Sequence, residues 1–302
     1  MTHIDYISGE ELLRRVRPSK AVDALITALT GGFDPARDLP RTRYDVAGGS
    51  LMLMPATVPA HFGVKVLSLA NDPAARGIPL IQGAYLLFDA SSMAPTALID
   101  GAALTALRTP AVSIAGVRHL LVESPEPLRT VIFGTGLQAR HHEAALIDVL
   151  EGVRDVEVTF VGRSTPRDDA AAALKAAELV ITATSATDPV VSGDELREDA
   201  IVVAMGAHTA DTRELAGDVF AGATVIVEDV DVALREAGDV VQAIAEGYIQ
   251  ESDLVGLKEA VTSRAGLDKN GSRVVFKTTG MPWEDLVVAA EAVAPAAGTQ
   301  AQ

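Results

Sequence analysis

The sequence contains no cysteine among its 302 residues. This absence excludes disulfides, thiolate metal sites and a cysteine nucleophile. Basic residues are also scarce, because 25 Lys and Arg stand against 41 Asp and Glu, which gives a net charge of −16. We expect no binding to nucleic acid or to an anionic membrane surface, since both select basic faces. Any anionic ligand must therefore be held by a few local cations.

Long apolar runs are missing as well. No run of about 18 residues lacks a charge, Gly or Pro, so no membrane-spanning helix is expected. The first residues are charged and lack the apolar core of a signal peptide. These features predict a cytoplasmic protein. The hydrophobic fraction of 48% is typical of a globular chain, and the length suggests two modest domains or one large one.

Three parts of the chain differ in pattern. The N-terminus predicts two helices, and the first begins at Ser8 with Glu11 at capping-box spacing. Residues 41–100 are short apolar segments divided by Gly, Pro and Asn-Asp, which predicts antiparallel strands, and residues 101–120 return to a helical pattern. After a proline-rich connector at 121–130, strands alternate with helices. This alternation predicts a parallel sheet covered on both faces.

The most informative motif is an apolar strand that runs into G-x-G-x-x-A. In such a motif the first glycine permits a tight turn, the second allows a pyrophosphate to approach, and the small last residue lets helix and strand pack closely. Because a predicted strand precedes it and a predicted helix follows it, we interpret it as a dinucleotide site at a helix N-terminus. A purely structural turn is the alternative. The expected cofactor contacts are Gly134, Thr135, Gly136, Leu137, Gln138 and Ala139.

The choice between NAD and NADP depends on the end of the next strand, about 20 residues further on. A carboxylate there would bind the ribose 2′-OH of NAD, but none is present. Arg163, Ser164 and Thr165 stand there instead and could hold a 2′-phosphate. We therefore predict that NADP(H) is preferred and that NAD(H) is possible. The alternative is that these are ordinary solvated loop residues.

Five segments in order resemble the ornithine cyclodeaminase/μ-crystallin family: GVKVLSLAND at 63–72, TALRTPAVS at 105–113, FGTGLQAR at 133–140, VAMGAHTADTREL at 203–215 and FKTTGMPWEDL at 276–286. The resemblance implies an α/β protein with a Rossmann-type dinucleotide-binding domain at 121–278. It also implies an α+β substrate-binding and dimerisation domain built from 1–120 and 279–302. A homodimer and chemistry at the α-carbon of an amino or imino acid are implied with it.

The resemblance further implies a carboxylate pocket made by Arg41, Lys65 and Arg108. The residues themselves agree in part, because Lys65 interrupts an apolar strand and Arg108 interrupts a run of small apolar residues. Structural ion pairs are the alternative for both. Further cofactor contacts are expected from residues in the matching segments and at one further strand end: Thr109, Thr184, Ser185, Met205 and Thr278.

Two positions depart from ornithine cyclodeaminase. His208 stands where that enzyme has an aspartate, and Met52 stands where it has the glutamate that binds the distal amine. A thioether cannot pair with an ammonium group, so a cyclodeaminase that uses NAD⁺ is the less favoured alternative. We predict a reductase of a small α-imino acid, or an amino-acid dehydrogenase in reverse, with Lys65 and His208 as catalytic groups. A non-catalytic NADP(H)-binding protein is the second alternative.

No metal site is expected. His141 and His142 are adjacent, and neighbouring side chains on a helix point about 100° apart. The acidic run at 228–231 is interpreted as solvated surface, and Trp283 as a packing residue.

Overall fold

The computed structural model describes residues 4–263 and 271–294, which form two compact units. The mixed-sheet unit contains residues 4–28, 37–108 and 281–294. The parallel-sheet unit contains residues 29–36, 109–263 and 271–280. This division differs from the predicted domain limits, because it falls within helix α4 (Gly101–Ala115) and assigns residues 29–36 to the second unit.

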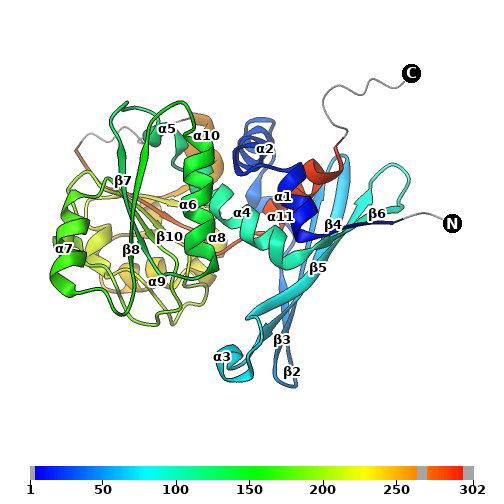
Figure 1. Cartoon of the computed structure of the whole chain (residues 1–302), viewed down its shortest axis with the longest axis horizontal. Coiled ribbons are helices and arrows are strands. Elements are labelled where there is room, and N and C mark those ends of the chain that lie inside the picture. Colours follow the sequence, from blue (N-terminus) through cyan, green and yellow to red (C-terminus); the bar gives the residue numbers. More distant parts are fainter. Residues whose placement is uncertain (1–3, 264–270, 295–302) are drawn as a thin grey trace. The chain divides into compact units, whose positions relative to one another are not determined.

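The mixed-sheet unit is built on six strands in the order β1-β6-β5-β4-β3-β2 (Figure 1). All neighbouring strands are antiparallel except β1 and β6, which are parallel. The pattern of residues 41–100 predicted the antiparallel strands but not β1. The strands are β1 (Asp5–Ile7), β2 (Thr42–Val46), β3 (Gly49–Val58), β4 (His61–Ala70), β5 (Ile81–Asp89) and β6 (Pro95–Asp100). The helices among them are α1 (Gly9–Arg15), α2 (Pro18–Thr30), α3 (Pro73–Arg76) and α11 (Pro282–Val293).

Local sequence explains how these elements begin and which face they bury. Ser8 caps α1 as predicted, since its hydroxyl accepts the backbone N–H of Glu11 at 3.3 Å. Residues of β3 alternate in burial, and α11 packs across β3, β4 and β5. The strand register places Met54 opposite Lys65, and Lys65 opposite Tyr85. These three residues therefore share the buried face of the sheet.

The parallel-sheet unit has seven strands in the order β12-β11-β13-β10-β9-β7-β8, and every pair is parallel (Figure 1). The predicted α/β fold with a Rossmann-type unit is confirmed. The strands are β7 (Leu128–Phe133), β8 (Val156–Val161), β9 (Leu179–Thr182), β10 (Ile201–Ala204), β11 (Thr224–Val227), β12 (Leu254–Gly256) and β13 (Val274–Lys277). The helices are α5 (Arg118–Leu121), α6 (Leu137–Val149), α7 (Arg167–Ala176), α8 (Val230–Glu236), α9 (Gly238–Ala245) and α10 (Leu257–Ser263).

The central strands β9 and β10 are buried at every residue, which explains their continuous apolar runs, whereas the edge strand β8 alternates with exposed residues. Val202 belongs to the core that includes residues of α7 and α9, whereas its neighbour Val203 is buried on the opposite face. The connections from β9 to β10 and from β10 to β11 contain short 3₁₀ helices, at Gly193–Glu195 and Gly217–Phe220, rather than α-helices. None of the helices in the described ranges is long and apolar enough to cross a bilayer.

Strand order sets the place where a ligand can bind. From β7 the chain first adds β8 on one side and then returns to add β9 on the other. In open parallel sheets, ligands bind beyond the carboxyl ends of the strands at such a reversal. The glycine motif follows β7 directly, so it lies at this point.

Candidate functional site

Lys65 lies in the middle of β4 and has no exposed surface. Its ammonium group is 2.8 Å from Oδ1 and 2.7 Å from Oδ2 of Asp285, which comes from α11. It also donates a hydrogen bond of 3.2 Å to the hydroxyl of Thr105 on α4. Burial lowers the pKa of Lys65 to about 8, although the charge of Asp285 opposes this shift. Lys65 is therefore closer to losing its proton near neutral pH than an exposed lysine is.

Arg108 lies one helical turn beyond Thr105 on α4. Its Nη1 is 2.9 Å from Oε2 of Glu284, and its Nε is 3.3 Å from Oδ1 of Asp285. Arg108 is buried, and both carboxylates have no exposed surface. Lys65, Arg108, Glu284 and Asp285 thus form what we name the charge cluster, in which two cations face two carboxylates. Such pairing offsets part of the free energy that is lost when the four charges are removed from water.

The acidic half of the charge cluster was not predicted. Glu284 and Asp285 lie in the first turn of α11, and every residue from 282 to 289 is buried. Two adjacent acids followed by five apolar residues at 286–290 were the available signal, because a buried carboxylate needs a partner. Trp283, predicted as a packing residue, is fully buried beside them, and its backbone N–H donates to Asp38 at 2.9 Å.

The remaining predicted substrate residues lie on the neighbouring strands. Arg41 directly precedes β2 and is half-buried, and the next residue, Thr42, pairs with Leu53 on β3. Met52 is buried on the inward face, where it packs with Met54 and Leu67. The surroundings of Met52 are therefore apolar.

Tyr85 is a further residue that sequence reasoning missed. It pairs with Lys65 across β4 and β5 and is fully buried. Within the described residues its hydroxyl has no hydrogen-bond partner. Burial raises its pKa, and the charges of Asp285 and Asp38 add to the shift. A side chain at Gly63 would lie 2.6 Å from this hydroxyl, so the glycine makes room for the ring.

In the parallel-sheet unit, the two glycines of the motif have different surroundings. Gly134 has φ +107, and a Cβ there would lie 2.4 Å from the carbonyl oxygen of Ala183. Gly136 is the N-cap residue of α6, with φ −78, and a Cβ there would meet no atom within 4 Å. The fold itself therefore requires Gly134, whereas Gly136 leaves open space at a helix N-terminus. That space and the unpaired amides of the first turn suit a pyrophosphate.

The other predicted residues of this motif differ in how far they are exposed to solvent. Thr135 and Leu137 are exposed, Gln138 is half-buried and Ala139 is fully buried. Ala139 is thus the residue of the turn that packs against the interior. The turn after β8 lies next to this motif, since a Cβ at Gly162 would be 3.2 Å from Cγ2 of Thr135.

The turn after β8 carries the predicted phosphate-binding residues. Arg163 and Ser164 are exposed, whereas the hydroxyl of Thr165 accepts the backbone N–H of Gly162 at 3.0 Å. Thr165 therefore helps to close the turn. No carboxylate lies between 162 and 166.

The remaining predicted cofactor residues, and His208, differ in their hydrogen bonds and in their exposure to solvent. Thr184 donates its backbone N–H and its hydroxyl to Glu214, at 2.8 and 2.7 Å. Ser185 and His208 are exposed, and Nδ1 of His208 lies 3.2 Å from the carbonyl oxygen of Gly206. Met205 is half-buried and Thr278 is buried, and Thr109, which lies in helix α4 rather than at a strand end, is buried as well.

The interpretation of the acidic run at 228–231 as solvated surface is wrong for Glu228. Its side chain is buried and accepts the backbone N–H groups of Thr279 and Gly280. Asp229 caps α8 by accepting the N–H of Val232 at 3.0 Å. The run follows β11, so its first residue lies at a strand end among backbone donors rather than in solvent.

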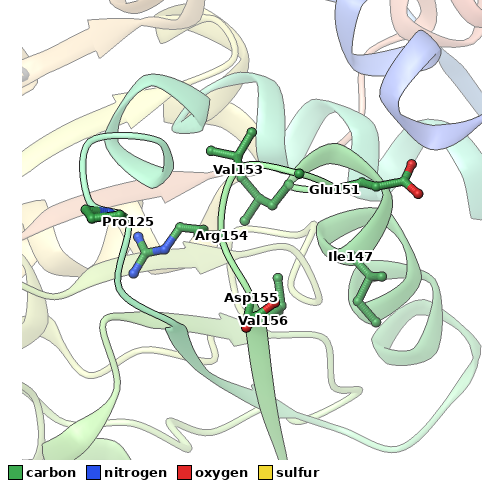
Figure 2. A pocket seen from close by; sticks show the side chains of 9 residues that line it. Pro125, Ile147, Glu151, Val153, Arg154, Asp155 and Val156 are labelled. Carbon is green, nitrogen blue, oxygen red and sulfur yellow. The ribbon is translucent and has the colours of Figure 1, made fainter.

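An open pocket of about 680 Å³ lies at the amino ends of β7 and β8, on the edge of the parallel sheet opposite to the glycine motif (Figure 2). Arg154 is among its lining residues, and Figure 2 shows its side chain directed toward Pro125. All three nitrogens of its guanidinium are engaged, because Nε donates to the carbonyl of Glu126, Nη1 to the carbonyl of Leu121 and Nη2 to Glu178 at 3.0 Å. We therefore assign this pocket no part in binding an anion.

His142, on α6, is fully buried. Its Nδ1 lies 2.8 Å from the carbonyl oxygen of Gln138, and its Nε2 lies 3.0 Å from the hydroxyl of Ser113. Burial lowers the pKa of His142 to about 4. This histidine is therefore neutral near pH 7 and links α6 to α4. Among the described residues, no three His, Cys, Asp or Glu side chains gather in a way that could hold a metal ion.

Comparisons with known proteins agree on one family. A sequence model of the ornithine cyclodeaminase/mu-crystallin family matches residues 10–297. Ketimine reductase mu-crystallin of Mus musculus is 28% identical over 306 residues, covering 94% of this chain and 95% of that protein. Delta(1)-pyrroline-2-carboxylate reductase 1 of Burkholderia multivorans is 30% identical, covering 80% and 78%. The structure of Thermococcus litoralis Delta(1)-pyrroline-2-carboxylate reductase in complex with NADH and L-proline superposes with a TM-score of 0.83, at 26% identity and 96% coverage of both chains.

Proposed function

Because this chain belongs to the ornithine cyclodeaminase/mu-crystallin family, we propose that it is an oxidoreductase that reduces the C=N bond of a small α-imino acid. We further propose that NADPH is the preferred reductant and that the reverse reaction oxidises an amino acid. Relatives named as ketimine and pyrroline-2-carboxylate reductases support the reaction class. The observation that carries the proposal is the charge cluster, which brings a titratable lysine and an arginine to one carboxylate.

In this proposal Arg108, together with Arg41, binds the substrate carboxylate, since a guanidinium can hold a carboxylate through two parallel hydrogen bonds. Lys65 donates a proton to the imine nitrogen when hydride adds to the α-carbon. A lysine with a pKa of about 8 suits this task, because a general acid works best when its pKa lies near the working pH. The buried hydroxyl of Tyr85 is a second polar group beside Lys65.

The cofactor is assigned to the turn after β7 and to the neighbouring strand ends. The amides at the start of α6 would hold its pyrophosphate, and Arg163 with Ser164 would hold the 2′-phosphate of NADP(H). When bound, the nicotinamide supplies the hydride. His208, exposed on the loop after β10, is proposed as a second proton donor. The apolar surroundings of Met52 favour a substrate without a second ammonium group, which disfavours ornithine.

We also propose that the protein is a homodimer that pairs through the outward face of the mixed sheet. The register aligns Tyr6, Leu98, Leu86 and Val64 in one row on that face. Tyr6 is 66% exposed and Leu98 36% exposed, so the row presents apolar surface to solvent. Covering such a face is a common reason for self-association. Sedimentation of the wild type and of Leu98→Glu tests this, with a dimer and a monomer expected.

The experiment for the proposed function measures NADPH oxidation by the wild-type protein. The panel contains cyclic α-imino acids, and pyruvate or glyoxylate with ammonia or methylamine. Oxidation that depends on an imino acid supports the proposal. Conversion of ornithine to proline with NAD⁺ would support the cyclodeaminase instead. Cofactor binding without turnover of any imine would support a non-catalytic protein.

Two lysine variants test the role of the charge cluster. Lys65→Met should abolish turnover while NADPH affinity stays within about twofold. Lys175→Ala is the control, because Lys175 is an exposed lysine near the end of α7 and should behave as the wild type. Loss of NADPH binding in Lys65→Met would contradict the assigned role.

A further inference from the structure

Three buried ionisable residues lie at the carboxyl edge of the parallel sheet and have no part in the proposed reaction. Glu214 and Asp239 have no exposed surface, and Lys277 is 1% exposed. Lys277 is the last residue of β13, and Asp239 lies in the first turn of α9. Burial of charge is costly unless each group is paired and hydrogen-bonded. We name these three residues the edge triad.

Glu214 joins the ends of β9 and β10. On the β9 side its carboxylate accepts the hydroxyl of Thr182 at 2.9 Å, and both the N–H and the hydroxyl of Thr184. On the β10 side it accepts the N–H of Gly206 at 2.6 Å. A Cβ at Gly206 would lie 2.5 Å from this carboxylate, so the glycine permits the contact. One side chain therefore fixes two neighbouring strand ends.

Lys277 contacts the loop after β10 at Ala207, the residue that follows Gly206. Its ammonium group donates to the carbonyl oxygen of Ala207 at 2.6 Å and lies 2.9 Å from Oδ2 of Asp239. The other oxygen of Asp239 accepts the backbone N–H groups of Glu214 and Leu215, at 2.7 and 2.8 Å. Gly206 and Ala207 are thus held by two side chains that Asp239 connects. The residue that follows them is His208.

The place of the edge triad suggests its role. A dinucleotide binds across the reversal of strand order, with its adenosine toward β8. Its nicotinamide half must then lie toward the ends of β9 and β10, which the edge triad fixes. We propose that Glu214, supported by Asp239 and Lys277, is the positioning residue that shapes the nicotinamide half of the cofactor site. This inference rests on the proposed function.

The test compares how tightly the protein binds the whole cofactor and how tightly it binds the adenosine half alone. The dissociation constants of NADPH and of adenosine 2′,5′-bisphosphate, which lacks the nicotinamide, are measured for the wild type and for Glu214→Gln. The glutamine keeps one acceptor oxygen and places an amide where the other was, so either Thr184, or Thr182 together with Gly206, loses its acceptor. We expect NADPH affinity to fall about tenfold and the affinity for adenosine 2′,5′-bisphosphate to stay within about twofold.

Glu178→Gln is the matched control. Glu178 pairs with Arg154 at the opposite edge of the same sheet, so its loss should lower stability without changing either dissociation constant. Thr182→Val is the milder variant if Glu214→Gln does not fold. It removes one hydroxyl donor to Glu214 from a buried residue of nearly equal shape. We expect it to weaken NADPH binding about threefold, again without an effect on the adenosine end.

The outcomes separate this inference from the proposed function. If the wild-type protein binds neither NADPH nor NADH, both the proposed function and the positioning role of the edge triad are wrong. Wild-type binding with equal losses for both ligands, or with no loss in either variant, would overturn only the positioning role of the edge triad. A loss confined to NADPH in Glu214→Gln or Thr182→Val, together with an unchanged Glu178→Gln control, is the supporting result.

Discussion

The ammonium group of Lys65 lies 2.7 Å from the carboxylate of Asp285, and neither side chain has any exposed surface. Burial lowers the pKa of Lys65, and Asp285 is the main group that opposes this shift. Asp285 therefore decides over which pH range Lys65 keeps its proton. Because the proposed reaction needs protonated Lys65, activity should fall as pH rises through about 8.

Asp285→Asn should move this fall to lower pH. The neutral amide no longer stabilises the ammonium, while desolvation still lowers its pKa. We expect the alkaline limb of kcat/KM to shift downward by about one pH unit or more. Glu284→Gln is the matched control, because Glu284 is a smaller influence on the pKa of Lys65 and should give a smaller shift. An alkaline limb at the same pH in Asp285→Asn and wild type would contradict Lys65 as the acid.

The same pair predicts a stability effect that does not depend on catalysis. Lys65→Met should lower the free energy of unfolding by about 3–5 kcal/mol, since it leaves a buried carboxylate without its nearest cation. Adding Asp285→Leu should recover most of this loss, because both members of the pair are then removed. Urea denaturation followed by the fluorescence of the single, fully buried tryptophan measures both values. A double variant less stable than Lys65→Met would refute the explanation.

The two glycines of the nucleotide turn should respond differently to alanine. Gly136→Ala should fold normally, because φ is −78 and the new Cβ meets no atom within 4 Å. It should nevertheless weaken NADPH binding about tenfold or more, since the methyl group enters the space assigned to the pyrophosphate. Gly134→Ala should instead lower the melting temperature, because φ is +107 and the Cβ would lie 2.4 Å from a carbonyl oxygen.

Melting curves and NADPH titrations of the two glycine variants separate these effects. If Gly136→Ala binds NADPH as tightly as the wild type, the pyrophosphate does not lie at that helix N-terminus. If Gly134→Ala is as stable as the wild type, the close approach of residue 134 to the carbonyl of Ala183 does not limit the stability of the turn.

Arg163 predicts the choice between the two nicotinamide cofactors. Arg163→Ala should weaken NADPH binding by about ten- to a hundredfold, because a charge-assisted hydrogen bond to the 2′-phosphate is lost. The affinity for NADH should change little. Arg167→Ala is the control, since Arg167 is an exposed arginine at the start of α7. Equal effects of Arg163→Ala on NADPH and NADH would show that the residue does not read the 2′-phosphate.

The sequence predicted those features that depend on neighbours along the chain. The glycine turn, the parallel strands and the Ser8 cap are local patterns, and the structure has all of them. Lys65 could be recognised as unusual because a charge in an apolar strand needs an explanation. Its partner could not be identified in the same way. Asp285 is 220 residues away, and only the packing of α11 on β4 brings the two together.

The misread elements have related causes. β1 is three residues long, which is too short for an alternating pattern to be visible. The charge of its neighbours predicts Glu228 at the surface, whereas its burial follows from the backbone donors of Thr279 and Gly280. The sequence does not predict the edge triad, because Glu214, Asp239 and Lys277 are far apart along the chain and meet only at the strand ends.

His142 predicts a loss of stability in mild acid. Burial lowers its pKa from 6.5 to about 4 in the folded protein. Between pH 6.5 and about pH 4, His142 is therefore protonated in the unfolded chain and neutral in the folded protein. Through His142 alone, the free energy of unfolding is therefore unchanged above pH 6.5 and falls by about 1.4 kcal/mol per pH unit down to about pH 4, or about 3 kcal/mol in all. His142→Gln keeps a side chain that can donate to Ser113 or to the carbonyl of Gln138 but does not titrate. Urea denaturation at pH 7.5, 6 and 5 should show a shallower decline for this variant than for the wild type, and equal slopes would mean that His142 is not a source of the acid sensitivity.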